Sequence, residues 1–155
     1  MRREDREVTN ITEKIEIINN CKVVRLAVKD EEGLYIVPLN FGYSYFNDKL
    51  TLYFHSAKEG RKLNAIEENS EVAFEMDCEH RLIEADIACL YGFSFKSIIG
   101  NGVASIVENI EEKKIALSLL MKHQAGKAFT FEDKHAKAVT VFKVDVNNFS
   151  AKYHK

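Results

Sequence analysis

The stretch YFHSAKEGRK, residues 53–62, joins a strand to a helix and carries an unusual amount of positive charge. Apolar and polar residues alternate over KLTLYFH, residues 49–55, as they do in a half-buried strand. Arg61 and Lys62 then open GRKLNAIEEN, residues 60–69, which has the pattern of a short helix. Such a joint is either a solvated connection or a site that binds an anion.

Two features of this joint favour an anion. Ser56 and Glu59 have the spacing of a capping box, which predicts a helix that starts just after Ser56. A helix N-terminus presents unpaired N–H groups and partial positive charge, both of which suit a phosphate. Lys58, Arg61 and Lys62 add charge, although basic residues at this end of a helix oppose its dipole. That conflict puts an anion site on an equal footing with a solvated helix start.

The composition is that of one globular domain, which we expect to span residues 1–155. Hydrophobic residues make up 46% of the chain, and 22 basic against 24 acidic residues give a net charge of −2. This balance shows no global signature of binding to nucleic acid or to an acidic membrane. Three widely spaced cysteines and an N-terminus without an apolar leader favour a soluble, reduced, cytoplasmic protein. No apolar run approaches the ~20 residues that cross a bilayer.

The rest of the pattern is rich in strands. Asn10 and Asn109 each stand three residues before a glutamate, which predicts two further capped helices, the second over residues 108–124. Strands are predicted at residues 21–29, 34–41, 49–55, 71–77, 95–107 and 138–146, with a short one at 149–152. Several turns between them are too short for helical crossovers. We therefore expect a mainly antiparallel β-barrel with peripheral helices.

Three local features have two interpretations each. Pro38 marks an edge strand, or else VPLN, residues 37–40, breaks its pairing and offers backbone groups to a flat polar ligand. Arg25 lies inside a strand pattern, so its charge either extends along the surface to water or meets a partner. In SIIGNGVAS, residues 97–105, the glycines mark either a hairpin turn or a bulge in one long strand.

The chain lacks the common signatures of several other sites. His55 shares a strand face with Thr51 and Tyr53, and no second histidine or carboxylate stands at metal-ligand spacing, so we expect no metal. There is no GxGxxG after a strand, no GxxxxGK[ST] and no GxSxG. Their absence argues against Rossmann, P-loop and nucleophile-elbow chemistry.

Several segments together resemble the 5-nitroimidazole resistance (Nim) proteins. These segments are RLAVKDEEGLYIVPLNFGY, LYFHSAKEGRKLNAI, VAFEMD and SIIGNGVA, and with their flanks they span nearly the whole chain. Nim proteins belong to the pyridoxamine 5′-phosphate oxidase-like superfamily of FMN-binding split barrels. The resemblance implies an antiparallel Greek-key split barrel and a homodimer with FMN at the subunit interface. It also favours one long strand over a hairpin for SIIGNG.

The resemblance further implies which residues bind the cofactor. The FMN phosphate would be bound by Ser56, Arg61 and Lys62, with Lys58 as a helper. The isoalloxazine ring would lie along Val37, Pro38, Leu39 and Asn40 and against Phe54 and His55, and Ser97 and Ile98 of the partner subunit would close the site.

The implied function is FMN-dependent reduction of small electron-poor molecules such as nitroaromatic 5-nitroimidazoles, with electrons from a reduced nicotinamide or another donor. His55 is the expected catalytic residue, because histidine titrates near neutral pH and could donate a proton or orient substrate. Two alternatives stay open: a non-catalytic flavin- or haem-binding protein, and oxidation of pyridoxamine 5′-phosphate. The aromatic residues Tyr43, Tyr45 and Phe46 either shape a substrate pocket or simply pack.

Overall fold

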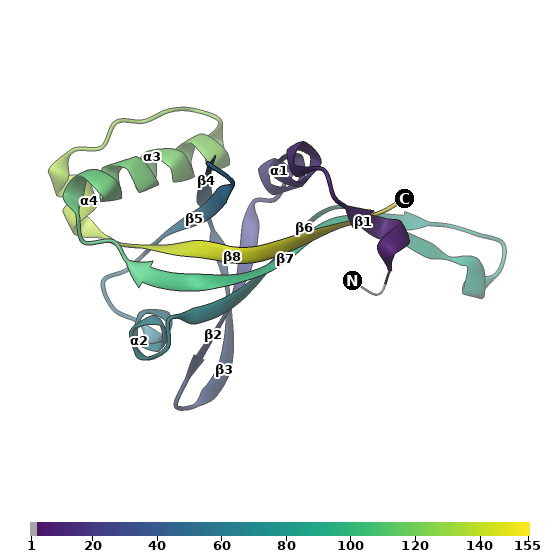
Figure 1. Ribbon diagram of the computed structural model, residues 1–155, viewed down its shortest axis with the longest axis horizontal. Helices are drawn as coiled ribbons and strands as arrows, with labels where there is room; N and C mark the ends of the chain where they lie inside the picture. Colours follow the sequence, from purple (N-terminus) through teal and green to yellow (C-terminus); the bar gives the residue numbers. More distant parts are fainter. Residues whose placement is uncertain (1–2) are drawn as a thin grey trace.

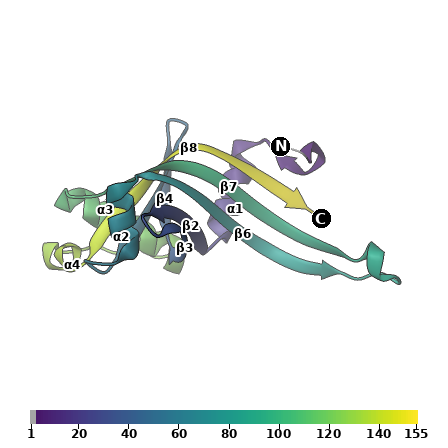
Figure 2. The ribbon, with the colours of Figure 1, turned by 90° about the horizontal axis from the view of Figure 1, so that it is seen from below.

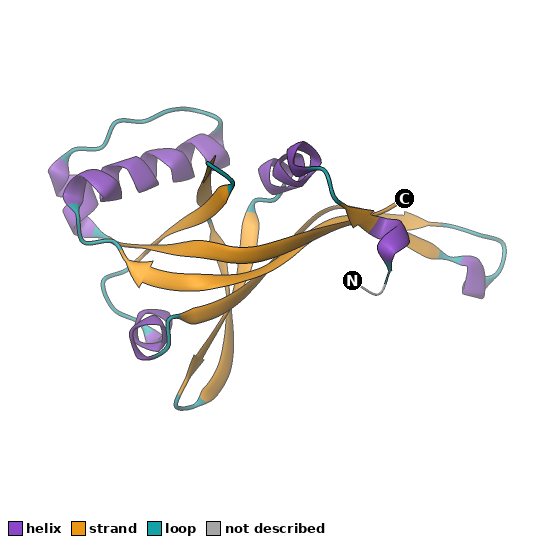
Figure 3. Cartoon of the chain, viewed as in Figure 1, coloured by secondary structure: helices purple, strands orange, loops and turns teal. Residues whose placement is uncertain are grey.

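A computed structural model describes residues 3–155, which form one antiparallel sheet with helices packed around it (Figures 1 and 3). The strands are β1 (Glu7–Val8), β2 (Val23–Asp30), β3 (Gly33–Asn40), β4 (Gly42–Phe46), β5 (Lys49–Ser56), β6 (Glu71–Ile83), β7 (Gly92–Ile106) and β8 (Thr140–His154). The helices are α1 (Ile11–Asn20), α2 (Arg61–Glu68), α3 (Ile110–Ala125) and α4 (Asp133–Ala138), with 3-10 turns at Glu4–Arg6 and Ala88–Leu90. None of the helices within this range is long and apolar enough to cross a membrane.

The strand order places the ends of the sheet side by side. Within residues 3–155 the order is β3-β2-β6-β7-β8-β5-β4, and β1 pairs with β8. Only Phe41 separates the last residue of β3 from the first residue of β4. Consecutive Cα atoms are about 3.8 Å apart, so the two outermost strands are within about 8 Å of each other there. They do not pair in the described part of the chain, and the barrel therefore stays open. The predicted split barrel is confirmed.

Two of the three predicted helix caps are confirmed. The Asn10 side chain accepts hydrogen bonds from two backbone N–H groups of α1, and the Asn109 side chain accepts two from α3. The cap predicted at Ser56 is wrong, because Ser56 is the last residue of β5. Helix α2 begins only at Arg61, after Gly60, whose φ of 148° disfavours any residue with a Cβ.

Strand β4 and helix α4 were not predicted from the pattern, and neither were the two-residue β1 and the two 3-10 turns. Strand β4 pairs with β5 through the turn at Asn47 and Asp48, whose φ angles of 49° and 59° suit a two-residue hairpin turn. Its aromatic sequence, GYSYF, lacks the clean alternation by which the other strands were identified. Helix α4 is only six residues long, too short to show a helical period. Strand β8 is also continuous where a strand and a separate short one were predicted.

The glycines of SIIGNG allow neighbouring groups to approach closely within one long strand. Strand β7 runs unbroken through them, and its register with β8 shifts between Asn101 and Gly102. A Cβ on Gly102 would overlap the carbonyl oxygen of Asp145, and one on Gly100 would overlap the ring of Phe74. The bulge interpretation is therefore confirmed, and the hairpin interpretation is wrong.

Strands β6 and β7 continue beyond the barrel as a projecting hairpin (Figure 2). Their register shifts between Cys78 and Arg81, where Glu79 has a φ of 58°. Past this irregularity the hairpin extends away from the body of the molecule. Its exposed apolar residues are Leu82, Ile87, Leu90, Tyr91 and Phe93.

Helix α3 covers the barrel close to the connection between β3 and β4. A Cβ on Gly42 would overlap the backbone of Leu119 and Leu120, so helix and strand are in direct backbone contact. Inside the barrel, Phe54 and Phe142 stack with ring centroids 4.9 Å apart. A smaller apolar cluster, which includes Leu117 and Val141, packs where α3 and α4 meet the sheet.

Candidate functional site

The predicted ring-binding residues lie on two strand edges that border the opening of the barrel. Strand β4 pairs with β5 only as far as Tyr53, whereas β5 continues to Ser56 with β8 on its other side. Across the opening, β3 has β2 as its one strand partner within residues 3–155. We call this opening the seam and define it by the backbone edges of residues 37–40 and 54–56.

Pro38 lies in an edge strand, as one of its two interpretations predicted. The ladder between β2 and β3 runs through Pro38 without a register shift, with Arg25 as its opposite residue. Proline has no N–H to donate, so its nitrogen faces the seam and not β2. Because an antiparallel ladder alternates, the backbone N–H groups of Ile36 and Asn40 face the seam as well. Within residues 3–155, the backbone N–H groups of Ile36 and Asn40 therefore have no partner in a strand ladder.

The side chains along this edge differ in what they can contact. Val37 and Leu39 pack against the barrel core. The Asn40 amide donates to the carbonyl oxygen of Lys22 at 3.0 Å and to the Gln124 side chain at 3.3 Å. Gln124 in turn donates to the Phe41 carbonyl at 2.8 Å, which ties α3 to the closed end of the seam. No local pattern of residues predicts this role of Gln124.

Phe54 and Ile98 are predicted cofactor contacts whose side chains are buried. Their side chains are 1% and 0% exposed and belong to the core of their own subunit. Any contact of Phe54 or Ile98 with a cofactor would therefore be made by the main chain. Ser97 is half-buried and faces the opposite way, as alternation along β7 requires.

His55 and Ser56 lie on opposite faces of β5. His55 is exposed on the outer face that it shares with Tyr53, as predicted. Ser56 is 6% exposed, and its Oγ atom has no hydrogen-bond partner among the described residues. A buried hydroxyl without a partner costs free energy, and such a group often marks a ligand position. Ser56 points inward because it continues the alternation of the buried residues Leu52 and Phe54 along β5.

The N-terminus of α2 is open to an anion. The N–H groups of Leu63 and Asn64 donate to the Gly60 carbonyl, at 2.9 Å and 3.3 Å. The first two amides, those of Arg61 and Lys62, precede the helical ladder, and no side chain within residues 3–155 caps this end. Free amides and the positive end of the helix dipole together suit a phosphate.

Arg61 is already engaged with acidic residues at the turn between β2 and β3. Its Nε and Nη2 atoms donate to Asp30 at 2.6 Å and 3.0 Å, and Nη1 lies 3.2 Å from Glu32. The guanidinium also lies over the Tyr35 ring, 4.7 Å from its centroid. The hydrogen bond from Arg61 lowers the pKa of Asp30. Lys58 and Lys62 form no ion pair within the described range, so their charges remain available.

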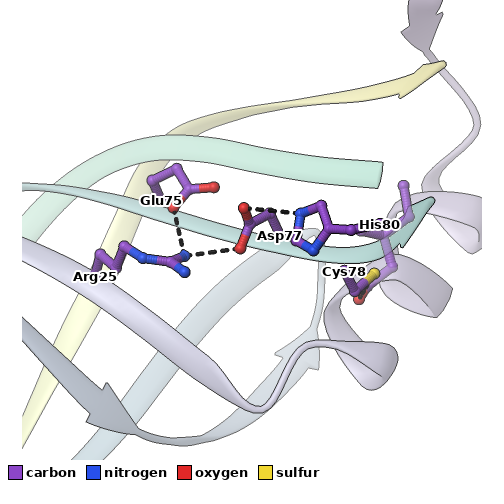
Figure 4. Close-up of polar contacts among 6 residues, drawn as sticks. Arg25, Glu75, Asp77, Cys78 and His80 are labelled. Atoms are coloured by element: carbon purple, nitrogen blue, oxygen red, sulfur yellow. Dashed lines mark hydrogen bonds and ion pairs between the residues drawn. The ribbon is translucent and has the colours of Figure 1, made fainter. Parts of the chain in front are cut away.

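A charged cluster on the outer face of the sheet explains Arg25 (Figure 4). Its Nη1 atom donates to Glu75 at 2.9 Å and to Asp77 at 2.7 Å, and Asp77 also contacts His80 Nε2 at 3.0 Å. The prediction that Arg25 meets a partner is confirmed. Burial and, next, the charge of Asp77 raise the pKa of Glu75. Asp77 pairs across the ladder with Ser97, so the cluster lies beside a predicted cofactor residue.

The same outer face carries exposed apolar side chains. Leu34 is 82% exposed and Ile36 is 64% exposed, both on β3. Ile99 and Val103 on β7 are exposed as well. Exposed apolar residues gathered on one face are typical of an interaction surface.

These features define an antiparallel split barrel in which a buried serine hydroxyl without a partner among the described residues precedes an uncapped helix N-terminus. The family model described as pyridoxamine 5′-phosphate oxidase matches residues 11–153. The chain belongs to the pyridoxamine 5′-phosphate oxidase-like family. A comparison with curated proteins finds no match.

Solved structures agree with this family. The chain is 31% identical to a candidate 5-nitroimidazole antibiotic resistance protein from Bacteroides thetaiotaomicron, with a TM-score of 0.80 over 95% of this chain and 86% of that one. A FAD-binding protein from Mesorhizobium loti is 22% identical, with a TM-score of 0.66 over 97% and 98% of the two chains. The flavocytochrome Anf3 from Azotobacter vinelandii is 15% identical, with a TM-score of 0.79 over 100% of this chain and 72% of that one. The last two likenesses show the fold alone.

Proposed function

We propose that the protein binds FMN along the seam and uses it to reduce small electron-poor molecules, such as nitroaromatic compounds. The observation that carries this proposal is the buried Ser56 hydroxyl, unpartnered among the described residues, close in sequence to the uncapped N-terminus of α2. A phosphate there would accept hydrogen bonds from Ser56 and from the amides of Arg61 and Lys62. Lys58 and Lys62 would balance its charge.

The rest of the seam fits a flat ring. Free backbone groups on β3, at Ile36 and Asn40, would hydrogen-bond the polar edge of the isoalloxazine, and the main chain of residues 54–55 would face it. When bound, the flavin accepts electrons from a donor and passes them to the substrate. His55 is exposed, so its imidazole is free to orient a substrate or hold a proton beside it. Membership of the pyridoxamine 5′-phosphate oxidase-like family and the 31% identity to a candidate nitroimidazole resistance protein support this class of cofactor and substrate.

A homodimer would cover the apolar outer face. Leu34, Ile36 and Ile99 are exposed around the Arg25 cluster, and the projecting hairpin adds further apolar residues. Burying these side chains against a second copy removes apolar area from water. In such a dimer, Ser97 of the partner subunit would close the flavin site. An Ile36→Glu change is expected to shift the protein to a monomer in analytical ultracentrifugation, and an unchanged dimer would contradict this interface.

The visible absorption spectrum of the purified protein tests the cofactor, since it distinguishes flavin, haem and no cofactor. Anaerobic addition of NADH or NADPH should bleach bound FMN, and a 5-nitroimidazole should restore its colour. Bound FMN that no donor reduces would contradict a reductase. Hydrogen peroxide release with pyridoxamine 5′-phosphate would instead indicate an oxidase.

Two matched double variants test the phosphate site. Arg61→Ala with Lys62→Ala should abolish FMN binding, because it removes both basic side chains at the helix N-terminus. Lys127→Ala with Lys137→Ala removes the same charge far along the sequence and should leave the affinity unchanged. Equal affinities for the two variants would refute the phosphate assignment.

A further inference from the structure

A second candidate binding site lies between α1, β4 and α3. It is a groove of about 410 Å³ that shares no lining residue with the seam. In Figure 1, α1 and α3 lie on one side of the sheet and α2 lies on the other. The residues that matter for its chemistry are Ile15, Lys22, Tyr43, Tyr45, Lys122 and His123.

The groove has aromatic walls that are held in place. The rings of Tyr43 and His123 meet edge to face, with centroids 5.5 Å apart and planes at 83°. The Tyr43 hydroxyl donates to the Asn19 side chain at 2.7 Å, which fixes the ring against α1. Tyr45 and Ile15 add apolar surface. Rings and an aliphatic side chain in a groove of this size suit a flat aromatic ligand.

His123 is an uncharged aromatic wall of the groove. Its Nε2 atom lies 2.8 Å from the carbonyl oxygen of Cys21, so Nε2 carries a proton and donates it. Burial lowers the pKa of His123, with a smaller effect of Lys22 in the same direction. The imidazole is therefore neutral at pH 7, and Nδ1 keeps a lone pair.

The charge balance favours a ligand with one negative charge. Both α1 and α3 end beside the groove, and each helix C-terminus is equivalent to about −0.5 charge. Lys22 and Lys122 line the groove and carry two positive charges. The two helix ends together offset about one of them, which leaves a net charge of about +1 at the groove. Lys22 donates to the His123 carbonyl at 2.7 Å, whereas Lys122 forms no ion pair within residues 3–155. Two carboxylates lie nearby but do not line the groove: Glu16 lines the adjoining hollow along α1, and Asp48 accepts a hydrogen bond from the Tyr45 hydroxyl at 3.1 Å.

We infer that the groove between α1, β4 and α3 binds a small flat aromatic monoanion, with its carboxylate at Lys122 and its ring between Tyr43 and Tyr45. This site is independent of the flavin proposed in the seam. It also gives Tyr43 and Tyr45 a role in binding beyond packing.

Fluorescence titration with 2-naphthoate tests this inference. The chain has no tryptophan, so naphthoate can be excited without interference from indole. Saturable binding to the wild type is expected, and the uncharged analogue 2-naphthamide should bind more weakly. Lys122→Gln should weaken naphthoate binding about three- to fivefold, in keeping with a surface ion pair. Lys127→Gln removes the same charge outside the groove and should change the affinity less than twofold.

Three outcomes would overturn the inference. The first is no saturable naphthoate binding at millimolar concentration. The second is equal affinity for naphthoate and naphthamide, or equal effects of the Lys122 and Lys127 changes. The third is competition between FMN and naphthoate, because that result would place the naphthoate in the seam. A protein that fails to bind FMN but still binds naphthoate through Lys122 would contradict the proposed function and leave this site standing.

Discussion

Arg61 and Asp30 form a pair with two hydrogen bonds, 2.6 Å and 3.0 Å long, that joins the start of α2 to the end of β2. The pair ties the helix that follows β5 to the turn between β2 and β3, whereas Phe41 alone joins β3 to β4. The pair also occupies two of the N–H groups with which an arginine grips a phosphate. A carboxylate and the proposed FMN phosphate would therefore compete for one guanidinium.

Asp30→Asn should therefore raise the affinity for FMN several-fold, because it removes the competing negative charge and frees the guanidinium of Arg61. Quenching of flavin fluorescence on titration measures this affinity. Asp86→Asn, on the projecting hairpin, removes the same charge elsewhere and serves as the control. Weaker FMN binding by the Asp30 variant would show instead that Asp30 positions Arg61 for the phosphate.

Ser56→Ala should affect FMN binding without lowering the stability of the fold. The hydroxyl is buried without a partner among the described residues, so its removal should leave the free energy of unfolding unchanged or slightly higher. FMN affinity should fall by about tenfold, which corresponds to one lost hydrogen bond to a charged group. Urea unfolding without cofactor and flavin titration supply the two measurements. A variant that is destabilised and binds FMN normally would mean that Ser56 has only a structural role.

Gly42→Ala should destabilise the fold by about 1–3 kcal/mol, because a methyl group at this position overlaps the α3 backbone at Leu120. Gly92→Ala is the matched control, since its Cβ would meet only the Ile83 side chain, at an ordinary 3.4 Å. Thermal unfolding of the two variants measures the difference. Equal melting temperatures would contradict direct packing of α3 on β4.

His123 should make the protein less stable in mild acid. Its pKa is lowered in the folded state, chiefly by burial. Below about pH 6.5 the unfolded chain therefore takes up a proton that the folded protein does not, and stability falls as the pH falls. One such group contributes at most about 1.4 kcal/mol per pH unit. Urea unfolding at pH 7.5 and pH 5.5 should show a smaller loss in His123→Gln than in the wild type, and an equal loss would contradict a neutral buried imidazole.

Local patterns predicted the elements whose causes are local. Asn10 and Asn109 cap their helices because a cap depends on a few consecutive residues. The alternation of Leu50, Leu52 and Phe54 identified β5, and the same alternation, carried two residues further, would have placed Ser56 inward. The same alternation also predicts that the side chain of Phe54 belongs to the core.

Contacts between distant segments could not be predicted in this way. Asp30 and Arg61 are 31 residues apart, and their pairing depends on how the β2–β3 hairpin lies against α2. The groove beside Tyr43 is lined by both α1 and α3. Strands β2 to β7 lie between these two helices along the chain. The side on which the barrel opens depends on the pairing order of the sheet, which no local pattern contains.

The order of the strands has a consequence for synthesis on the ribosome. Strand β8 pairs with β1, β5 and β7, so it links the β4–β5 hairpin to the rest of the sheet. Residues 140–154 emerge after every other strand, and until then those two parts have no ladder between them. The nascent chain must therefore hold the β4–β5 hairpin apart from the four-stranded β3-β2-β6-β7 sheet, each with exposed edges, and the barrel can assemble only once β8 is released.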